Sequence, residues 1–175
     1  MTVRYVLQQA DITRALARIS HEILESNRGS AGLVILGVPT RGVTLATRLG
    51  VILNTIEPGT VSVGSLDVTM YRDDLAKNPT RAPGRTTIPA GGIDGKTVVL
   101  VDDVLYSGRT IRSALDALSD LARARTVRLA VLVDRGHREL PIRADFVGKN
   151  LPTSTSERIM VRLAEIDGVD EVTIE

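Results

Sequence analysis

The feature that most constrains this chain is the stretch Val98–Thr110, in which an apolar run leads into two acids and a small-residue turn. The run is rich in β-branched residues, which is typical of a strand buried on both faces. Asp102 and Asp103 follow, then Tyr106-Ser-Gly-Arg-Thr110, after which apolar residues recur at helical spacing. The stretch therefore predicts a strand with an acidic end, a tight loop and a helix.

Each part of this stretch has a chemical use in binding a sugar phosphate. A loop that opens a helix presents unpaired backbone N–H groups and the positive end of the helix dipole, which favours a phosphate. Gly108 allows the backbone to approach an anion closely, and Ser107 or Thr110 adds a hydroxyl that can also cap the helix. The two carboxylates would then lie near the sugar hydroxyls. An ordinary strand end followed by a helix cap is the alternative.

A similar unit precedes this one. The apolar run from Gly32 to Gly37 predicts a buried strand, Val38-Pro-Thr-Arg-Gly42 its loop, and Val43 to Asn54 the next helix. In parallel sheets such loops gather at the carboxyl ends of the strands, where ligands bind. Arg41 can bind a second phosphate group through two parallel hydrogen bonds. A turn with a surface arginine is the alternative reading.

The rest of the chain continues the alternation of strands and helices, which predicts an α/β fold. Residues 11–27 form an amphipathic pattern that Asp11 or Thr13 could cap. Its apolar face is Ile12, Leu16, Ile19 and Ile23. Further strands are expected at Val3 to Leu7, Val61 to Tyr71 and Thr126 to Asp134, and a terminal hairpin joins residues 159–163 to 172–174 across Asp167-Gly168.

Two long segments show neither the helical nor the strand spacing of apolar residues. Residues 72–93 are interrupted by proline and glycine and carry both signs of charge, which predicts a flexible lid loop over a charged substrate, with a linker as the alternative. Residues 135–156 are too polar for a core helix and predict a hood over the ligand end of the sheet.

Composition limits the remaining possibilities. A chain of 175 residues fits a single domain, here 1–175. No membrane-length apolar run and no signal-peptide pattern is present, so we expect a cytoplasmic protein without a membrane partner. The chain has no cysteine, which excludes thiolate metal sites. With a net charge of +1 and 2% aromatic residues, any nucleic-acid surface must be a local patch.

The central stretch resembles the phosphoribosyl pyrophosphate (PRPP) signature of the type I phosphoribosyltransferases, and neither the Walker nor the dinucleotide motif. The resemblance implies their fold: a mostly parallel sheet flanked by helices, with a hood and a C-terminal β-hairpin. It also implies PRPP or UMP contacts along the stretch, from Val98, Val99, Leu100, Val101, Val104, Leu105, Tyr106, Ser107, Gly108, Arg109 and Thr110.

Pro39-Thr-Arg-Gly42 resembles the diphosphate loop of the same family. The resemblance implies diphosphate contacts from Pro39, Thr40, Arg41 and Gly42, joined by Arg72 and Arg85 of the lid. That loop commonly carries a cis peptide bond that is not at proline. Because a cis bond costs least before proline, we expect the cis bond of this chain at Val38–Pro39.

The run from Asp134 to Ser154, together with Leu66 to Leu75, narrows the resemblance to the bacterial pyrimidine operon regulators, which are also uracil phosphoribosyltransferases. This implies a chain that converts uracil and PRPP to UMP and diphosphate, and that binds pyrimidine operon leader mRNA when uridine nucleotides are plentiful. It also implies a homo-oligomer, dimer or tetramer. Mg²⁺ would bind mainly through PRPP and water, so no protein ligand set for a metal is expected.

The same resemblance gives roles to charged residues. Asp102 and Asp103 are the expected catalytic residues, because a carboxylate near the ribose stabilises the positive charge of the transition state. Two clusters are candidates for RNA binding: Arg14, Arg18 and His21 on one helix side, and Arg138, Arg143 and Lys149 in the hood. For the helix cluster, the alternative is a solvated helix face. For the function, the alternatives are a regulator with little catalysis, a purine-type transferase and a nucleotide sensor without RNA.

Overall fold

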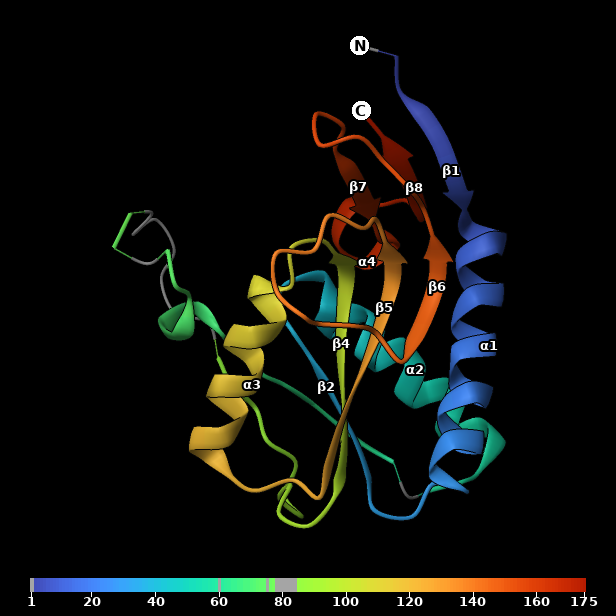
Figure 1. The fold of residues 1–175 in the computed structure, drawn as a ribbon. Helices are drawn as coiled ribbons and strands as arrows, with labels where there is room; N and C mark the ends of the chain where they lie inside the picture. The colour runs from blue at the N-terminus through green and yellow to red at the C-terminus, as the bar shows by residue number, and fades with distance from the viewer. Residues whose placement is uncertain (1, 60, 75, 78–84) are drawn as a thin grey trace.

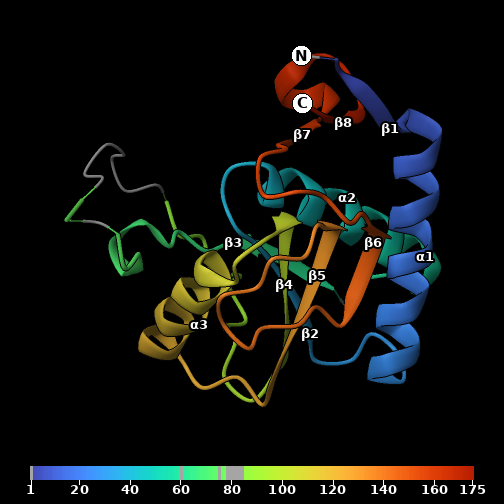
Figure 2. The same ribbon diagram turned by 45° about the horizontal axis from the view of Figure 1, so that its top comes forward.

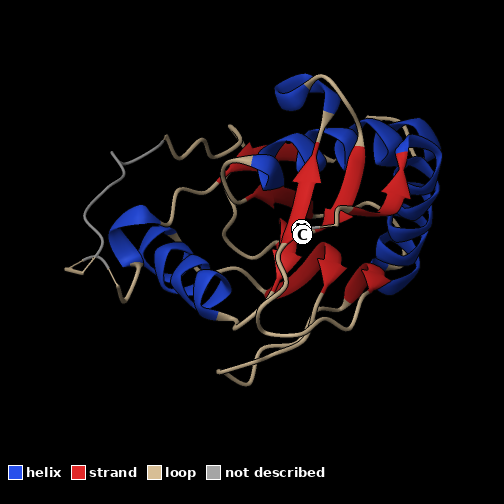
Figure 3. Cartoon of the chain, turned by 90° about the horizontal axis from the view of Figure 1, so that it is seen from above, coloured by secondary structure: helices blue, strands red, loops and turns tan. Residues whose placement is uncertain are grey.

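A five-stranded parallel sheet lies at the centre of the computed structural model, which describes residues 2–59, 61–74, 76–77 and 85–175. The strand order is β3-β2-β4-β5-β6. The strands are β2 (Leu33–Gly37), β3 (Ser62–Ser65), β4 (Thr97–Leu105), β5 (Thr126–Asp134) and β6 (Phe146–Asn150). Helices α1 (Gln9–Asn27) and α2 (Arg41–Ile56) cover one face, and α3 (Arg109–Leu121) covers the other (Figures 1 and 3).

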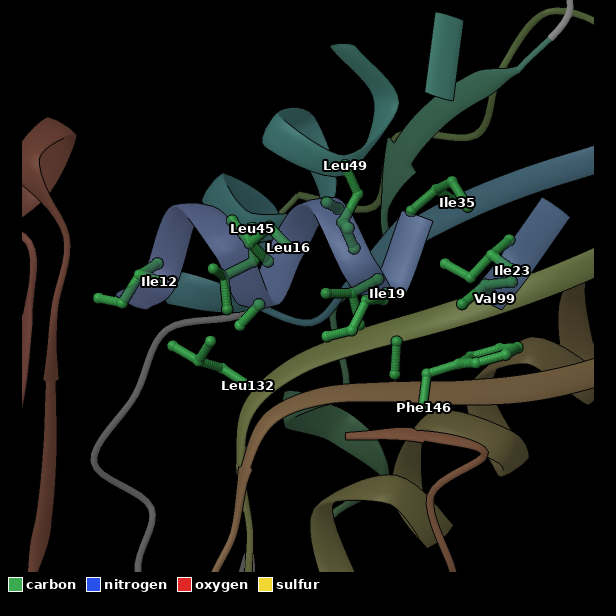
Figure 4. Packing of buried hydrophobic residues seen from close by; sticks show 14 of the residues in the cluster. Ile12, Leu16, Ile19, Ile23, Ile35, Leu45, Leu49, Val99, Leu132 and Phe146 are labelled. Carbon is green, nitrogen blue, oxygen red and sulfur yellow. The ribbon is translucent and has the colours of Figure 1, made fainter. Parts of the chain in front are cut away.

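Helix α1 buries the apolar face that its sequence predicts. Ile12, Leu16, Ile19 and Ile23 are each at most 3% exposed and point toward the sheet (Figure 4). The helix begins at Gln9, before the expected Asp11, because the Asp11 carboxylate accepts a hydrogen bond from the Gln8 N–H (2.9 Å) and completes a capping box.

Strand β4 is buried on both faces, as its composition predicts. Val99 and Val101 belong to the core on the side of α1 and α2, whereas Val98 and Leu100 belong to the core under α3. The alternation of side chains along a strand produces this division. These four side chains are at most 2% exposed, so they belong to the core on the two faces of the sheet.

A second, antiparallel sheet has the order β1-β8-β7 and lies beyond the carboxyl ends of the central strands (Figures 1 and 2). Its strands are β1 (Arg4–Gln8), β7 (Ile159–Arg162) and β8 (Glu171–Ile174), with the short helix α4 (Ala164–Asp167) between β7 and β8. The terminal hairpin is therefore confirmed, and β1 pairs with β8 as a third strand.

Two expectations about strands need correction. The strand predicted over Val61 to Tyr71 ends at Ser65, and a 3-10 turn, η1 (Thr69–Tyr71), follows. The reason is that the Asp67 carboxylate accepts hydrogen bonds from the backbone N–H (3.4 Å) and hydroxyl (2.8 Å) of Thr69, which turns the chain.

The hood region also differs from its expected form. It contains strand β6, which pairs in parallel with β5 at the edge of the sheet. An edge strand pairs with one neighbouring strand, and the last residues of β6 are exposed to solvent. Lys149 and Asn150 can therefore be polar, whereas Phe146 at the start of the strand is buried. Among the described residues, no helix is long and apolar enough to cross a membrane.

Candidate functional site

The loop after β4 has the geometry of an anion-binding turn. Gly108 is the residue before α3 and has φ +92°, a left-handed conformation that favours glycine. The Ser107 hydroxyl accepts a hydrogen bond from the Arg109 N–H (3.3 Å), so Ser107 rather than Thr110 satisfies the start of the helix. The remaining N–H groups of the first turn are available to a phosphate.

Asp102 and Asp103 lie within β4 and have different surroundings. Asp102 is 7% exposed, and its carboxylate accepts the Asp103 N–H (2.9 Å). Asp103 is half-buried and accepts the Val104 N–H (2.8 Å). Burial, and after it the charge of Asp103, raises the pKa of Asp102 well above its ordinary value. The pair therefore offers one carboxyl that tends to keep its proton and a second that is nearer to solvent.

The loop between β2 and α2 carries the other predicted phosphate contacts, at Pro39, Thr40, Arg41 and Gly42. Its cis peptide bond is Pro39–Thr40, so the expectation of a cis bond at Val38–Pro39 was wrong. Val38, the residue after β2, donates its N–H to the Val101 carbonyl of β4 (2.9 Å), so the loop begins against that strand.

Gly42 brings this loop against the acidic end of β4. A Cβ atom at Gly42 would lie 2.4 Å from the Val101 carbonyl oxygen and 3.3 Å from the Asp102 Cα, which no side chain could accept. The absence of a side chain lets the start of α2 pack on β4 beside Asp102. Two loops that are about 60 residues apart in sequence therefore meet at the same edge of the sheet, as parallel strands require.

A cavity of about 450 Å³ opens beside the loop after β4. Arg72 lines it and pairs with Asp74 (2.6 Å). Arg109 also lines it and pairs with Asp73 (2.5 Å) and with Glu139 of the hood (2.6 Å). The complete lining is Pro39, Asp67, Val68, Thr69, Arg72, Asp73, Asp74, Ser107, Arg109, Thr110 and Ser113.

Arg85, the other predicted contact from the lid, does not line this cavity in the described part of the chain. Its carbonyl accepts the Ser65 hydroxyl (3.0 Å), and Thr87 exchanges two backbone hydrogen bonds with Ser65 (2.9 Å each). The segment thus returns to the end of β3. Residues 75 and 78–84 of the predicted lid lie outside the described residues.

The hood encloses a second cavity of about 410 Å³ at the ends of β5 and β6. Arg135 is 8% exposed and connects the two sides of the hood. Its guanidinium donates hydrogen bonds to the Thr153 hydroxyl (3.0 Å) and the Ser154 carbonyl (2.9 Å). The same guanidinium lies 4.3 Å above the Tyr106 ring. The lining is Asp134, Arg135, Gly136, His137, Arg138, Asn150, Leu151, Pro152 and Thr153. Ser107 lines the first cavity, and Arg135 of the second cavity lies against the neighbouring residue, Tyr106.

Of the residues predicted to bind RNA, the structure groups some and separates others. Arg14 and His21 are exposed on α1, and Arg18 reaches the β6 backbone, where it donates to the Gly148 carbonyl (2.7 Å). Lys149 is exposed on β6, and it contributes, after the Gln8 N–H and Arg14, to lowering the pKa of Asp11 on α1. Arg14, Arg18, His21 and Lys149 thus form one surface, which we call the α1–β6 surface.

The second expected cluster does not exist as one group. Arg138 turns inward and donates to the carbonyls of Ile142 (2.8 Å) and Tyr106 (2.7 Å) and to the Asp134 carboxylate (2.6 Å). Arg143 lines a separate hollow beside α3, on the opposite face of the sheet from α1. The reason is that residues 135–145 cross the carboxyl end and the α3 face before β6 begins, which distributes their charges.

Several residues of this region were missed by sequence reasoning. Asp67 and Thr69 line the first cavity, and their Asp-x-Thr spacing is a recognisable turn signal. Arg135 and His137 line the second cavity, and Asp167 binds Arg41. Nothing local in the sequence marks these three, because their partners are distant in the chain. Among the described residues, no three His, Cys, Asp or Glu side chains are grouped to hold a metal ion.

Comparison with known families finds that residues 3–162 match the model of the phosphoribosyl transferase domain. The curated relatives include a "Bifunctional protein PyrR" from Leifsonia xyli subsp. xyli, 73% identical over 180 aligned residues that cover 100% of this chain and 98% of the relative. A protein of the same name from Streptomyces coelicolor is 63% identical and covers 98% of this chain and 89% of the relative.

Comparison with solved structures shows the same fold at low identity. A hypoxanthine phosphoribosyltransferase from Staphylococcus aureus superimposes with a TM-score of 0.69 at 18% identity, and covers 97% of this chain and 90% of its own. The hypoxanthine phosphoribosyl transferase of Trypanosoma cruzi gives a TM-score of 0.75 at 16% identity, with 98% and 90% covered. The predicted fold class is confirmed.

Proposed function

Because the chain belongs to the phosphoribosyl transferase family, we propose that it is a uracil phosphoribosyltransferase that also regulates pyrimidine genes. It converts uracil and PRPP to UMP and diphosphate, and with UMP bound it binds the leader mRNA of the pyrimidine operon. The observation that carries this proposal is the loop after β4, the strand that carries Asp102 and Asp103: its residues Ser107, Arg109 and Thr110 line the first cavity, and Arg135 of the second cavity lies over its Tyr106 ring. The bifunctional name of the relatives at 73% and 63% identity supports the two roles.

The loop after β4 holds the 5′-phosphate of PRPP or UMP. Ser107, Gly108, Arg109 and Thr110 supply hydroxyls, backbone N–H groups and a guanidinium. Arg109 is paired with Asp73 and Glu139, which occupy part of its hydrogen-bonding capacity. A phosphate dianion competes well for these donors, because it carries more negative charge than a single carboxylate.

Diphosphate binds at the loop before α2 and at the first cavity. Arg41 and Thr40 come from that loop, and Arg72 reaches the cavity from the start of the lid. Arg85 joins them when the lid covers the substrate. Mg²⁺ would bind mainly through PRPP oxygens and water, where it would neutralise charge on the diphosphate.

The acids of β4 stabilise the transition state. Departure of diphosphate leaves positive charge on the ribose ring, and a carboxylate beside it gains more from that charge than from the neutral ground state. Asp103 is nearer to solvent and supplies the negative charge, whereas Asp102, with its raised pKa, holds the ribose hydroxyls by hydrogen bonds. Asp103 also assists the loss of the uracil proton.

Uracil occupies the second cavity. The segments Gly136 to Arg138 and Asn150 to Thr153 line it, and their polar groups suit the donors and acceptors of a pyrimidine edge. Arg135 stacks on Tyr106 and closes the hood over the phosphate loop. The purine-type alternative is tested by competition with hypoxanthine and guanine, and uracil should be the base that is consumed.

RNA binds at the α1–β6 surface. Arg14 is exposed and Lys149 lies nearby on β6, so both are available to phosphates. Each phosphate neutralised on single-stranded RNA should contribute a slope of about −0.7 to the plot of log affinity against log salt. The internal contacts of Arg138 make it a poor phosphate ligand, and we assign it to the hood.

The deciding experiment measures UMP formation from uracil and PRPP beside leader-RNA binding, with and without UMP, on one preparation. Wild-type protein should form UMP and should bind RNA more tightly with UMP present. Arg14→Glu with Lys149→Glu should weaken RNA binding and reduce the salt slope, with UMP formation retained. Arg112→Glu with Arg123→Glu makes the same change of charge on and after α3, across the sheet, and should leave RNA binding unchanged.

Each outcome separates the candidates. UMP-dependent RNA binding without turnover would favour a pure regulator, and turnover without RNA binding would favour a nucleotide enzyme. Equal loss of RNA binding in both charge-reversed variants would reject the α1–β6 surface as the RNA site.

A further inference from the structure

Two arginines of α2 meet three carboxylates of the segment that joins β7 to β8. Arg41, the first residue of α2, pairs with Asp167, and Arg48 pairs with Glu165 (2.5 Å) and Asp170 (2.7 Å). The antiparallel sheet is therefore fixed to the helix that begins at the diphosphate loop. Of the two arginines, only Arg41 belongs to that loop.

The Arg41–Asp167 contact is a two-point hydrogen bond along one edge of the guanidinium. Nη2 donates to Oδ1 (2.7 Å) and Nε donates to Oδ2 (3.3 Å). The side chains are 31% and 19% exposed, so the pair is largely shielded from solvent. A guanidinium presents further N–H donors beyond this edge, and Nη1 has no partner among the described residues.

Asp167 is itself anchored. Its Oδ2 accepts the backbone N–H of Leu163 (2.8 Å), which belongs to the same tight turn. The hydrogen bonds from Arg41, and after them the one from Leu163, lower the pKa of Asp167, so the carboxylate is ionised at neutral pH. An anchored carboxylate fixes the direction of the guanidinium that it binds, in addition to balancing its charge.

We propose that Asp167 is a positioning residue for diphosphate: it holds Arg41 by the Nε edge and leaves the Nη1 side for the diphosphate of PRPP. This rests on the proposed function, in which Arg41 is a diphosphate ligand. Helix α4, which joins β7 to β8, thereby takes part in substrate binding, although none of its residues lines either cavity among the described residues.

A competing arrangement is one in which Asp167 blocks Arg41 and must leave before diphosphate binds. The geometry favours positioning, because diphosphate can use Nη1 and the second hydrogen of Nη2 without displacing the carboxylate. The two arrangements predict opposite effects. Loss of a positioning carboxylate weakens PRPP binding, whereas loss of a blocking carboxylate strengthens it.

The test is Asp167→Asn, compared with Glu165→Gln, which weakens the neighbouring pair on Arg48 at the same interface. Asp167→Asn should raise the KM for PRPP and the inhibition constant of diphosphate by about ten-fold, with a smaller change in kcat. The affinity for UMP, which carries no diphosphate, should be unchanged. Glu165→Gln should leave the KM for PRPP at the wild-type value.

A double-mutant cycle with Arg41→Gln completes the test. In the Arg41→Gln background, Asp167→Asn should have no further effect on the KM for PRPP, because its action passes through Arg41. If Asp167→Asn does not fold, Asp167→Glu keeps the charge with a longer side chain and should give a KM between the wild-type value and that of Arg41→Gln.

Three results would overturn the positioning role: a KM for PRPP that falls in Asp167→Asn, an equal rise in Glu165→Gln, or an effect of Asp167→Asn that persists without Arg41. A wild-type protein that neither forms UMP nor binds PRPP would instead overturn the proposed function, and this inference with it. An active wild type with an unchanged Asp167→Asn variant would reject the inference alone.

Discussion

Asp102 and Asp103 are adjacent in β4, yet their carboxylates have different surroundings. Asp102 points into a buried environment and Asp103 remains half-buried, because alternate side chains of a strand face opposite sides of the sheet. The sequence predicted that both acids act at the site and that they divide their duties. It did not predict which one is buried, since this depends on Gly42 and the start of α2 packing against β4.

Asp103→Asn tests the electrostatic role of the half-buried acid. The amide keeps the size of the side chain and can still accept the Val104 N–H, so the fold should be retained. Loss of the negative charge should lower kcat by about 10²-fold, as removal of one preorganised electrostatic group does. Steady-state UMP formation measures kcat, and thermal unfolding serves as the control for folding. A variant with near-normal turnover would contradict the assignment.

Asp102→Asn tests the buried acid through stability. The raised pKa of Asp102 means that the folded chain binds its proton more tightly than the unfolded chain. The unfolded chain loses the proton first as pH rises, so the free energy of unfolding falls from the ordinary pKa of aspartate up to the folded pKa. Asn does not ionise, and Asp102→Asn should therefore be more stable than wild type at neutral pH, by at least about 1 kcal/mol.

The measurement for Asp102→Asn is a series of thermal unfolding curves from about pH 3 to about pH 8. The advantage of the variant should be smallest at the acid end and should grow as pH rises. A constant difference across the series would show that Asp102 titrates normally in the folded chain.

At the scale of elements, strand and helix positions followed from hydrophobic periodicity where the pattern was strong. The buried run of β4, the apolar face of α1 and the terminal hairpin are confirmed. Strand β6 was missed because an edge strand of five residues, two of them exposed and polar, has almost no periodic signal. The early end of β3 was missed because the Asp67–Thr69 turn overrides an apolar pattern.

The contact between α1 and β6 explains a second departure from sequence reasoning. Arg18 was expected to face solvent with Arg14, yet its guanidinium donates to the carbonyls of Val147 (3.2 Å) and Gly148 (2.7 Å). Its side chain remains 49% exposed, so it can serve the fold and the surface at once. Helical spacing alone cannot distinguish these uses, because the partner strand lies about 130 residues further along the chain.

Arg18→Ala and Arg14→Ala form a matched pair for this contact. Arg18→Ala should lower the free energy of unfolding by about 1 kcal/mol, since it leaves backbone carbonyls of β6 without their donor. Arg14 is 71% exposed and, among the described residues, pairs only with Asp11 on its own helix, so Arg14→Ala should change stability by less than about 0.5 kcal/mol. Denaturant unfolding of the two variants compares them directly. Equal effects would show that the α1–β6 contact contributes nothing specific.

At the scale of the whole molecule, β6 connects the two proposed binding functions. Lys149 lies on the α1–β6 surface, and the next residue, Asn150, lines the second cavity. A change in the position of this strand on UMP binding would also move Lys149 on the α1–β6 surface. The strand is thus a short physical connection between the proposed nucleotide site and the proposed RNA site, without a path through the core.

This connection gives a prediction about reciprocity. If UMP raises the affinity for leader RNA by a given factor, RNA must raise the affinity for UMP by the same factor, and typical coupling corresponds to about 5-fold to 150-fold. Equilibrium titrations of UMP with and without saturating RNA measure this factor. The expected result is tighter UMP binding with RNA present. Identical UMP titrations would contradict UMP-dependent RNA binding.

The order β1-β8-β7 has a consequence for biosynthesis. Strand β1 leaves the ribosome early, but its only neighbour among the described strands, β8, is translated more than 160 residues later. During that interval β1 has an open edge and Leu7, buried at 6% exposure in the finished fold, has no packing partner from β8. Such long-range pairing slows folding and exposes the nascent chain to aggregation. Chaperone demand should therefore fall only when the final strand emerges.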